Sequence, residues 1–198
     1  ADMGDEGETV VYPRTPWKRP AFLASTEGPT ALEAGLLYHA VLQHLDFSKP
    51  VDVNGIAVQI KELSDQGIIE KDLQSYLKPG KVAAFFQTEP GRIVLDYKHQ
   101  ILREWPFTYS LPAAELLAGQ EDTVVVQGII DLLAHTPSGF ILIDYKTDHV
   151  PKGEIEKLAE KYQLQFDYYK RAVESILHQP VCAAYLYAVT AEDAVRIY

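Results

Sequence analysis

The stretch GIIDLLAHTPSGFILIDYKTD, residues 128–148, places two aspartates and a lysine within strongly apolar segments. Aspartate is depleted from the interior of strands, so Asp131 and Asp144 call for an explanation. Two carboxylates beside an ammonium group are the equipment for holding a divalent metal ion and acting on a phosphate ester. The types and spacing of Asp131, Asp144 and Lys146 therefore indicate metal-assisted cleavage of nucleic acid.

The linker between the two apolar segments predicts a tight hairpin. Pro137 suits the second position of a turn and Gly139 the fourth. A hairpin centred between Pro137 and Ser138 pairs residues whose numbers sum to 275, so Asp131 lies directly opposite Asp144. Because side chains alternate along a strand, Lys146 lies on the same face, two residues further on.

Directly opposed like charges destabilise a sheet, because their Cβ atoms are only about 5 Å apart. Lys146 supplies one compensating charge, and a divalent ion would satisfy both carboxylates better. Oxygen ligands favour Mg²⁺ or Mn²⁺. The alternative is a salt-bridged Asp–Lys cluster in a purely structural hairpin. The opposed geometry and the apolar flanks favour the metal site.

The elements that must position these residues follow from the hydrophobic periodicity. Strands 123–134 and 139–147 are apolar on both faces, so we expect them to be central. The proline in residues 100–109 suggests an edge strand. The order predicts an α/β fold, a mixed sheet packed by helices on both sides. The other predicted elements are helices over 30–46, 54–64, 70–76, 81–87 and 153–178, and strands over 181–189 and 194–198.

The chain divides into an irregular, flexible N-terminal segment and one domain. Residues 1–29 hold four of the twelve prolines. Residues 30–198 form the domain, with a helical part over 30–90 and a sheet core over 91–198. No apolar run approaches the roughly 18 residues of a membrane helix. The single cysteine, Cys182, excludes a disulfide framework, a four-cysteine zinc site and a cysteine-ligated iron–sulfur cluster, and it fits a cytoplasmic location.

The net charge of −10, from 18 Lys+Arg against 28 Asp+Glu, argues against broad contact with DNA phosphates. It does not exclude an enzyme that engages phosphates through a bound metal ion. Nor does it exclude a fragment whose DNA path lies mostly on a partner.

Three further residues have two interpretations each. Gln165 lies on the apolar stripe of the predicted long helix, where an unpartnered glutamine costs about 1–3 kcal/mol. It either holds the active-site face or a nucleotide, or is a satisfied core residue, which the segment alone favours. His39, one helical turn after Gly35, is by itself more typical of a structural histidine. Glu104 reads as an edge-strand surface charge paired with Arg103.

Taken together, five stretches resemble the RecB-type branch of the PD-(D/E)xK nuclease superfamily, and most closely the C-terminal nuclease domains of AddA-type helicase–nuclease subunits. The stretches are GLLYHAVLQHL, REWPF, VVVQGIIDLL, LIDYKTD and YQLQFDYYKRAVE. The resemblance implies a restriction-endonuclease-like fold with an N-terminal helical extension. It also implies a chain excised from a larger bacterial polypeptide that carries a helicase.

The resemblance assigns roles by position. Asp131 and Asp144 match the metal-binding carboxylates, Lys146 the catalytic lysine, and His39 the upstream histidine of the metal site. The carbonyl oxygen of Tyr145 would be a further ligand.

Gln165 and Tyr169 match the family's Q-x-x-x-Y motif near the site, with Tyr162 preceding it. Glu104 matches the acidic residue of the R-E-x-P-F stretch.

The implied activity is Mg²⁺- or Mn²⁺-dependent, exonuclease-type hydrolysis of DNA at single strands or duplex ends, in double-strand break repair and recombination. The implied partners are DNA, the helicase part of the same polypeptide and an AddB-like protein. Two rivals stay open. One is a non-catalytic, nuclease-like module that binds DNA or a partner protein, and the other is a metal phosphohydrolase of small nucleotides.

Overall fold

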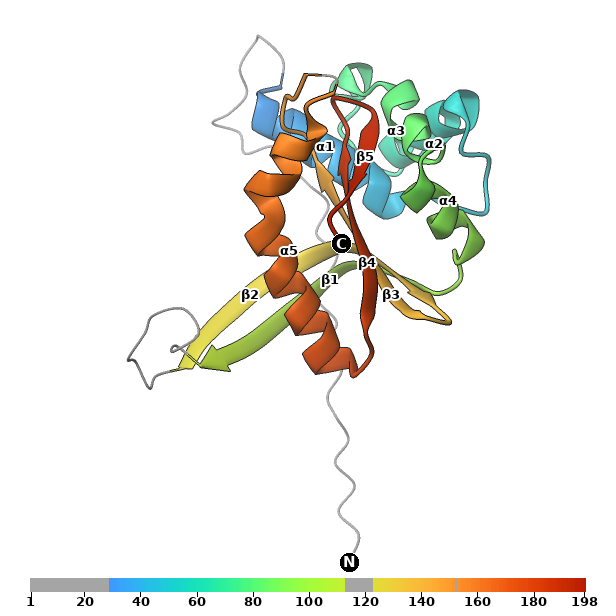
Figure 1. Cartoon of the computed structure of the whole chain (residues 1–198). Coiled ribbons are helices and arrows are strands. Elements are labelled where there is room, and N and C mark those ends of the chain that lie inside the picture. Colours follow the sequence, from blue (N-terminus) through green and yellow to red (C-terminus); the bar gives the residue numbers. More distant parts are fainter. Residues whose placement is uncertain (1–28, 113–122, 152) are drawn as a thin grey trace, which may run out of the picture.

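The chain folds into three layers, with four helices, α1–α4, over one face of a five-stranded sheet and α5 over the other (Figure 1). This computed structural model describes residues 29–112, 123–151 and 153–198, so residues 1–28 of the predicted N-terminal segment lie outside the described part. The predicted α/β class, a mixed sheet between helices, is confirmed. The elements are α1 Ala31–His44, α2 Val53–Asp65, the 3₁₀ helix η2 Gln74–Tyr76, α3 Pro79–Phe85, α4 Glu89–Asp96, β1 Ile101–Pro112, β2 Thr123–Thr136, β3 Gly139–Lys146, α5 Ile155–Leu177, β4 Val181–Ala188 and β5 Asp193–Arg196.

The sheet order follows the chain order, β1-β2-β3-β4-β5. Neighbouring strands run antiparallel except β3 and β4, which are parallel and are joined through α5 as the crossover helix. β1 is an edge strand and β3 the central one, as predicted. The outer half of β2 departs from the prediction of burial on both faces, because Val125 and Ile129 are exposed there.

The β2–β3 hairpin has the predicted register. Pairs run from Thr136 opposite Gly139 to Leu132 opposite Ile143, each summing to 275. The ladder between β2 and β3 ends at that last pair. Beyond it β2 continues beside β1 and β3 continues beside β4. The sheet therefore forks, and Asp131 and Asp144 are the first residues on the two sides of the fork.

Side-chain alternation inverts at the same level. On β2, Leu132 packs with the α1–α4 layer, whereas Ile130, two residues away, packs with α5. On β1, Ile101 packs with the α1–α4 layer and Trp105 with α5, although four residues should return a strand to the same face. The inversion turns the outer β1–β2 ribbon so that its apolar face covers α5 (Figure 1).

The helical layer differs from the prediction in two places. α4 was not predicted, although Thr88 caps it by accepting a hydrogen bond from the Gly91 N–H, and Pro90 occupies its first turn. The helix predicted over 70–76 is wrong, because this segment contains only the short η2. A few residues between turns cannot offset the cost of helix nucleation, and buried Leu73 and Leu77 hold the segment instead.

Among the described residues, no helix is both long and apolar enough to cross a membrane. The boundary predicted between a helical part and a sheet core at residue 90 stays a prediction.

Arg103 of β1 fastens the end of α1 to the sheet. Its guanidinium donates hydrogen bonds to the carbonyl oxygens of Gln43 at 2.7 Å and Leu45 at 2.6 Å, and it lies 3.7 Å from the centre of the Phe47 ring. These contacts use carbonyl groups that a helix end leaves without partners. The predicted surface pairing of Arg103 with Glu104 is wrong, because the Arg103 side chain turns to α1 and Glu104 is half-buried elsewhere.

The substitution Arg103→Met should lower the free energy of unfolding by roughly 2–3 kcal/mol, since hydrogen bonds from a charged donor contribute about 1.5–3 kcal/mol each. Urea unfolding of parent and variant measures this difference. Arg103→Lys should be intermediate, because an ammonium group cannot reproduce the planar fork. A Met variant as stable as the parent would show that α1 is held in place by other contacts.

Candidate metal centre

Three carboxylates form a row across three neighbouring strands. The β1–β2 pairs Arg103–Leu132 and Trp105–Ile130 flank Glu104 and Asp131, which sets these two residues opposite each other. The β2–β3 register sets Asp131 opposite Asp144 in turn. Neither carboxylate pair is itself part of a ladder. The row therefore lies where regular strand pairing is interrupted.

Glu104 has a left-handed backbone conformation in the middle of β1, with φ of 47°. Non-glycine residues rarely adopt positive φ, at a cost of about 1–3 kcal/mol, and such residues cluster at functional sites. This conformation coincides with the inversion of side-chain alternation. Its consequence is that the Glu104 carboxylate lies with those of the neighbouring strands.

Asp131 is held from two directions. One carboxylate oxygen accepts a hydrogen bond from the Tyr145 N–H at 2.7 Å, a donor that regular pairing would direct to a backbone carbonyl. The other oxygen lies 3.3 Å from Nδ1 of His39, which α1 brings over the fork. One ligand atom each from His39, Glu104 and Asp131 lies within 4.8 Å of the others. Two oxygens and one imidazole nitrogen at this spacing can share a divalent ion.

The close approach of α1 depends on Gly35. A Cβ atom at this position would lie 2.6 Å from the hydroxyl oxygen of Thr147, just beyond the end of β3. The sequence argument that Gly35 permits a close neighbour of the helix is confirmed, with a side chain as that neighbour. Gly35 and His39 are one helical turn apart, so this contact sets the position of the imidazole.

Asp144 and Lys146 form a buried pair beside this group. Nζ of Lys146 lies 2.7 Å from Oδ2 of Asp144, and the Asp144 residue is only 2% exposed. That ion-pair contact lacks hydrogen-bond geometry, and Oδ2 has no hydrogen-bond partner among the described residues. A buried carboxylate oxygen without a hydrogen bond is costly, and metal coordination would satisfy it.

Tyr162 covers the Lys146 ammonium, with its ring centre 4.3 Å from Nζ. Asp148 accepts a hydrogen bond from the Tyr162 hydroxyl, at 3.0 Å for the nearer oxygen, and pairs with Lys161 at 2.7 Å. The last aspartate of DYKTD therefore fixes the ring that lies against the lysine. Cation–π contact of this kind contributes about 0.5–2 kcal/mol and restricts where the ammonium can move.

Gln165 and Tyr169 make the hydrogen bonds that a buried glutamine needs. Nε2 of Gln165 donates to the Tyr169 hydroxyl at 2.6 Å, which donates to the Ile129 carbonyl oxygen at 3.0 Å. Ile129 lies two residues before Asp131 on β2. The pair thus links α5 to the strand that carries the central carboxylate.

Burial and mutual repulsion favour protonated acids. Burial raises the pKa of Asp144 to about 6, and the Asp131 charge acts in the same direction while Lys146 opposes it. Burial raises the pKa of Glu104 to about 7, with Asp131 contributing in the same direction. Burial alone would lower the pKa of His39, but its contact with Asp131 outweighs this and raises the pKa. A divalent cation would reverse this preference for protonation.

The structure brings together all the side chains that the sequence selected at positions 39, 131, 144 and 146. Gln165 and Tyr169 lie one strand step away, by way of Ile129. Tyr145 contributes its N–H to Asp131, and the role of its carbonyl oxygen stays a prediction. Sequence reasoning left Glu104 out of the site residues. The only sequence signal was an acidic residue in a predicted strand, and neither periodicity nor turn chemistry predicts a left-handed backbone there.

The chain matches known proteins along nearly its full length. The model of the PD-(D/E)XK nuclease superfamily matches residues 17–195. Three large proteins, each named as one component of an ATP-dependent helicase/nuclease, are similar to it, from Thermoanaerobacter sp. (strain X514), Desulforudis audaxviator and Pelotomaculum thermopropionicum. Their identities are 35%, 38% and 39%, over 94%, 98% and 85% of this chain. The chain spans only 16%, 16% and 14% of their lengths.

Without divalent ions, the chain should lose stability as the pH rises from about 5.5 to 7.5. Glu104, Asp144 and His39 all have folded-state pKa values above their ordinary values of 4.5, 3.8 and 6.5, so the folded chain binds more protons than the unfolded chain in this window. Stability then falls with pH, by an amount on the order of 1–3 kcal/mol.

Urea unfolding in EDTA at the two pH values tests this dependence. Glu104→Gln should flatten the profile, because the amide does not titrate. Stability that rises across this window in the parent would contradict the assignment of strained acids to the fork.

Proposed function

The chain belongs to the PD-(D/E)XK nuclease superfamily, and on that premise we propose that it is a metal-dependent deoxyribonuclease domain that hydrolyses phosphodiester bonds. The observation that carries the proposal is the row of Glu104, Asp131 and Asp144, with His39 and Lys146 on its two sides. A surface salt-bridge network would not need a buried carboxylate oxygen without a hydrogen bond, nor a left-handed residue within a strand.

Asp131, Asp144 and His39 are the proposed ligands of Mg²⁺ or Mn²⁺, with the Tyr145 carbonyl oxygen as a further one. Glu104 joins this set, because its carboxylate lies within reach of the same ion as the ligand atoms of His39 and Asp131. When bound, such an ion polarises a phosphoryl oxygen and lowers the pKa of a water molecule.

Lys146 has a role of its own in this proposal. Asp144 on one side and the Tyr162 ring on the other hold its ammonium beside the carboxylates. A cation fixed there stabilises the negative charge that develops on the phosphate as water attacks, and it orients that water. The aromatic cover restricts its movement, so little reorganisation is needed during the reaction.

The substrate and setting are proposed from the relatives, whose names join a helicase to a nuclease in one polypeptide. This chain corresponds to about a sixth of such a polypeptide. We therefore place it as the nuclease part of a helicase–nuclease that receives single-stranded DNA from its motor, acts as an exonuclease in double-strand break repair and recombination, and assembles with an AddB-like protein in the bacterial cytoplasm.

A non-catalytic binding module is the second candidate, and the net charge of −10 is the observation that favours it. Against it stands the cluster itself. Three acids, one histidine and one lysine kept together in a strained fork are costly, and a module without metal chemistry gains nothing from them. Isothermal calorimetry with Mn²⁺ separates the two, since the module predicts no divalent-ion binding at this site.

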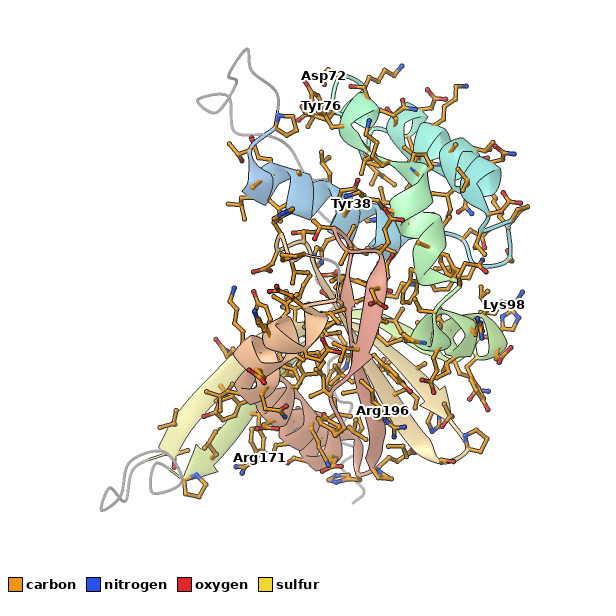
Figure 2. The ribbon with its side chains drawn as sticks, turned by 45° about the horizontal axis from the view of Figure 1, so that its top comes forward. Tyr38, Asp72, Tyr76, Lys98, Arg171 and Arg196 are labelled. Carbon is orange, nitrogen blue, oxygen red and sulfur yellow. The ribbon has the colours of Figure 1, made fainter. Side chains whose placement is uncertain are left out.

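Asp144→Asn and Lys146→Gln should each lower Mg²⁺- or Mn²⁺-dependent cleavage of labelled single-stranded DNA by roughly 100-fold or more, because each removes a group that acts on the developing charge. Gel electrophoresis of the products measures the rate. Matched controls are Asp72→Asn and Lys98→Gln, which change exposed residues far from α5 and the fork (Figure 2).

The controls should cleave at the parent rate. Full activity of folded Asp144→Asn would overturn the assignment of the centre. Circular dichroism and unfolding curves of each variant show whether a loss of cleavage comes from loss of the fold.

The isolated chain should bind DNA weakly, because its charge of −10 repels phosphates and the proposed motor and partner supply most phosphate contacts. Fluorescence anisotropy with a labelled single strand in EDTA, at about 150 mM salt, measures the affinity. A submicromolar dissociation constant would show that the domain has a phosphate-binding path of its own.

A further inference from the structure

An open pocket of about 410 Å³ lies between α5 and the β1–β2 ribbon. Its volume is within the range of roughly 300–1,000 Å³ typical of small-molecule sites. Three aromatic rings, two side-chain amides and one ammonium group account for most of its chemistry. They belong to Phe107, Tyr168, Tyr169, Gln127, Gln165 and Lys161.

Gly128 gives the pocket an aromatic floor. A Cβ atom at this position would lie 2.8 Å from the ring of Phe107 and 3.3 Å from the ring of Tyr169, so both rings lie close against bare backbone. Phe107 and Tyr169 meet edge to face, with ring centres 5.5 Å apart. Such a floor offers a ligand a rigid aromatic surface, because neither ring has space to turn away.

The charge and polarity of the pocket select its ligand further. Among the described residues that line it there is no carboxylate, although the chain carries an excess of ten negative charges. Lys161 supplies a cation at the rim, with 59% of its side chain exposed. An amide such as that of Gln127 or Gln165 both donates and accepts hydrogen bonds, and so suits the edge of a heterocycle.

The pocket adjoins the proposed metal centre by two routes. The Tyr169 hydroxyl donates to the carbonyl oxygen of Ile129, two residues from Asp131, which is roughly 7 Å along the strand. Lys161 shares Asp148 with Tyr162, whose ring covers Lys146. A ligand in the pocket therefore lies next to a phosphate at the centre.

We infer that this pocket receives one unpaired nucleobase of the DNA strand whose neighbouring phosphate reaches the metal centre. The inference rests on the proposed function, because the same strand must occupy both places. A base is planar and polar at its edges, and it is attached to a phosphate that Lys161 would meet at the rim. Bases of a duplex are stacked and paired, so only an unstacked base can enter, which makes the pocket selective for single strands.

An apolar side chain of a partner protein would fit the aromatic floor but not the two amides and the rim lysine. Aromatic stacking tolerates every base, and amides can pair with any of them. The pocket should therefore distinguish a nucleotide from a sugar phosphate, but should distinguish poorly between bases.

The test is nuclear magnetic resonance of the 198-residue chain in EDTA, titrated to millimolar concentration with thymidine 5′-monophosphate and, separately, with 2-deoxyribose 5-phosphate. The ring resonances of Tyr168 and Phe107 should shift with the nucleotide and stay in place with the sugar phosphate. Equal shifts with both compounds, or unmoved rings with both, overturn the inference. This readout needs neither metal nor cleavage.

Tyr168→Ala should weaken nucleotide binding roughly 5- to 100-fold, the range expected for loss of one stacking contact. Tyr168→Phe should retain binding, because the ring remains. The matched control Tyr76→Ala removes a tyrosine that is 47% exposed on the helical layer (Figure 2), and it should bind as the parent does. Equal affinity of Tyr168→Ala and parent for the nucleotide would overturn the inference.

A cleavage assay separates failure of this inference from failure of the proposed function. The parent should cleave an ordinary single strand faster than one in which an abasic site replaces the base next to the cut. Tyr168→Ala should lose most of that preference. Cleavage of both substrates at one rate by the parent would overturn the pocket and leave the nuclease standing.

Discussion

Mutual repulsion of three carboxylates on adjacent strands is the constraint around which this fold is arranged. Like charges directly opposed in a sheet are unfavourable, and burial makes the repulsion stronger. The structure answers with one donor or cation for each acid that it can reach. The Tyr145 N–H and His39 face Asp131, and Lys146 faces Asp144. Each of these answers requires a departure from regular pairing, and the fork in the sheet is the sum of those departures.

The rest of the architecture holds the fork in its shape. α1 must cross the end of β3 closely enough for His39 to reach Asp131, which Gly35 permits and Arg103 secures by binding the carbonyl groups at the end of the helix. α5 must cover the ribbon after its faces have inverted, and its aromatic residues do so. The positive φ of Glu104 is the cost of joining the two parts of β1 without a break.

The parts of this site that local chemistry determines could be read from the sequence. Turn residues around Pro137 set the register, and the register set Asp131 opposite Asp144. Helix α4 escaped prediction because its proline and glycine resemble a turn, whereas in the structure they occupy its capped first turn. Glu104 escaped for a deeper reason. Its conformation depends on tertiary contacts on both faces of the sheet, and no spacing along one strand encodes them.

The acidity of the site and its need for a cation are two aspects of one design. Acids whose pKa values are raised toward neutrality are unstable as a bare anionic cluster, so ionising them near pH 7 requires a positive partner. A lysine covers only one of the three, because its ammonium is committed to Asp144 and Tyr162. The same excess of negative charge disfavours DNA phosphates at the fork in the absence of metal. Metal and substrate then depend on each other, since a divalent ion both relieves the strain among the acids and gives an incoming phosphate its attractive partner. A domain built this way gains specificity from the ion and from contacts to bases, and leaves general affinity for the backbone to the rest of a larger protein.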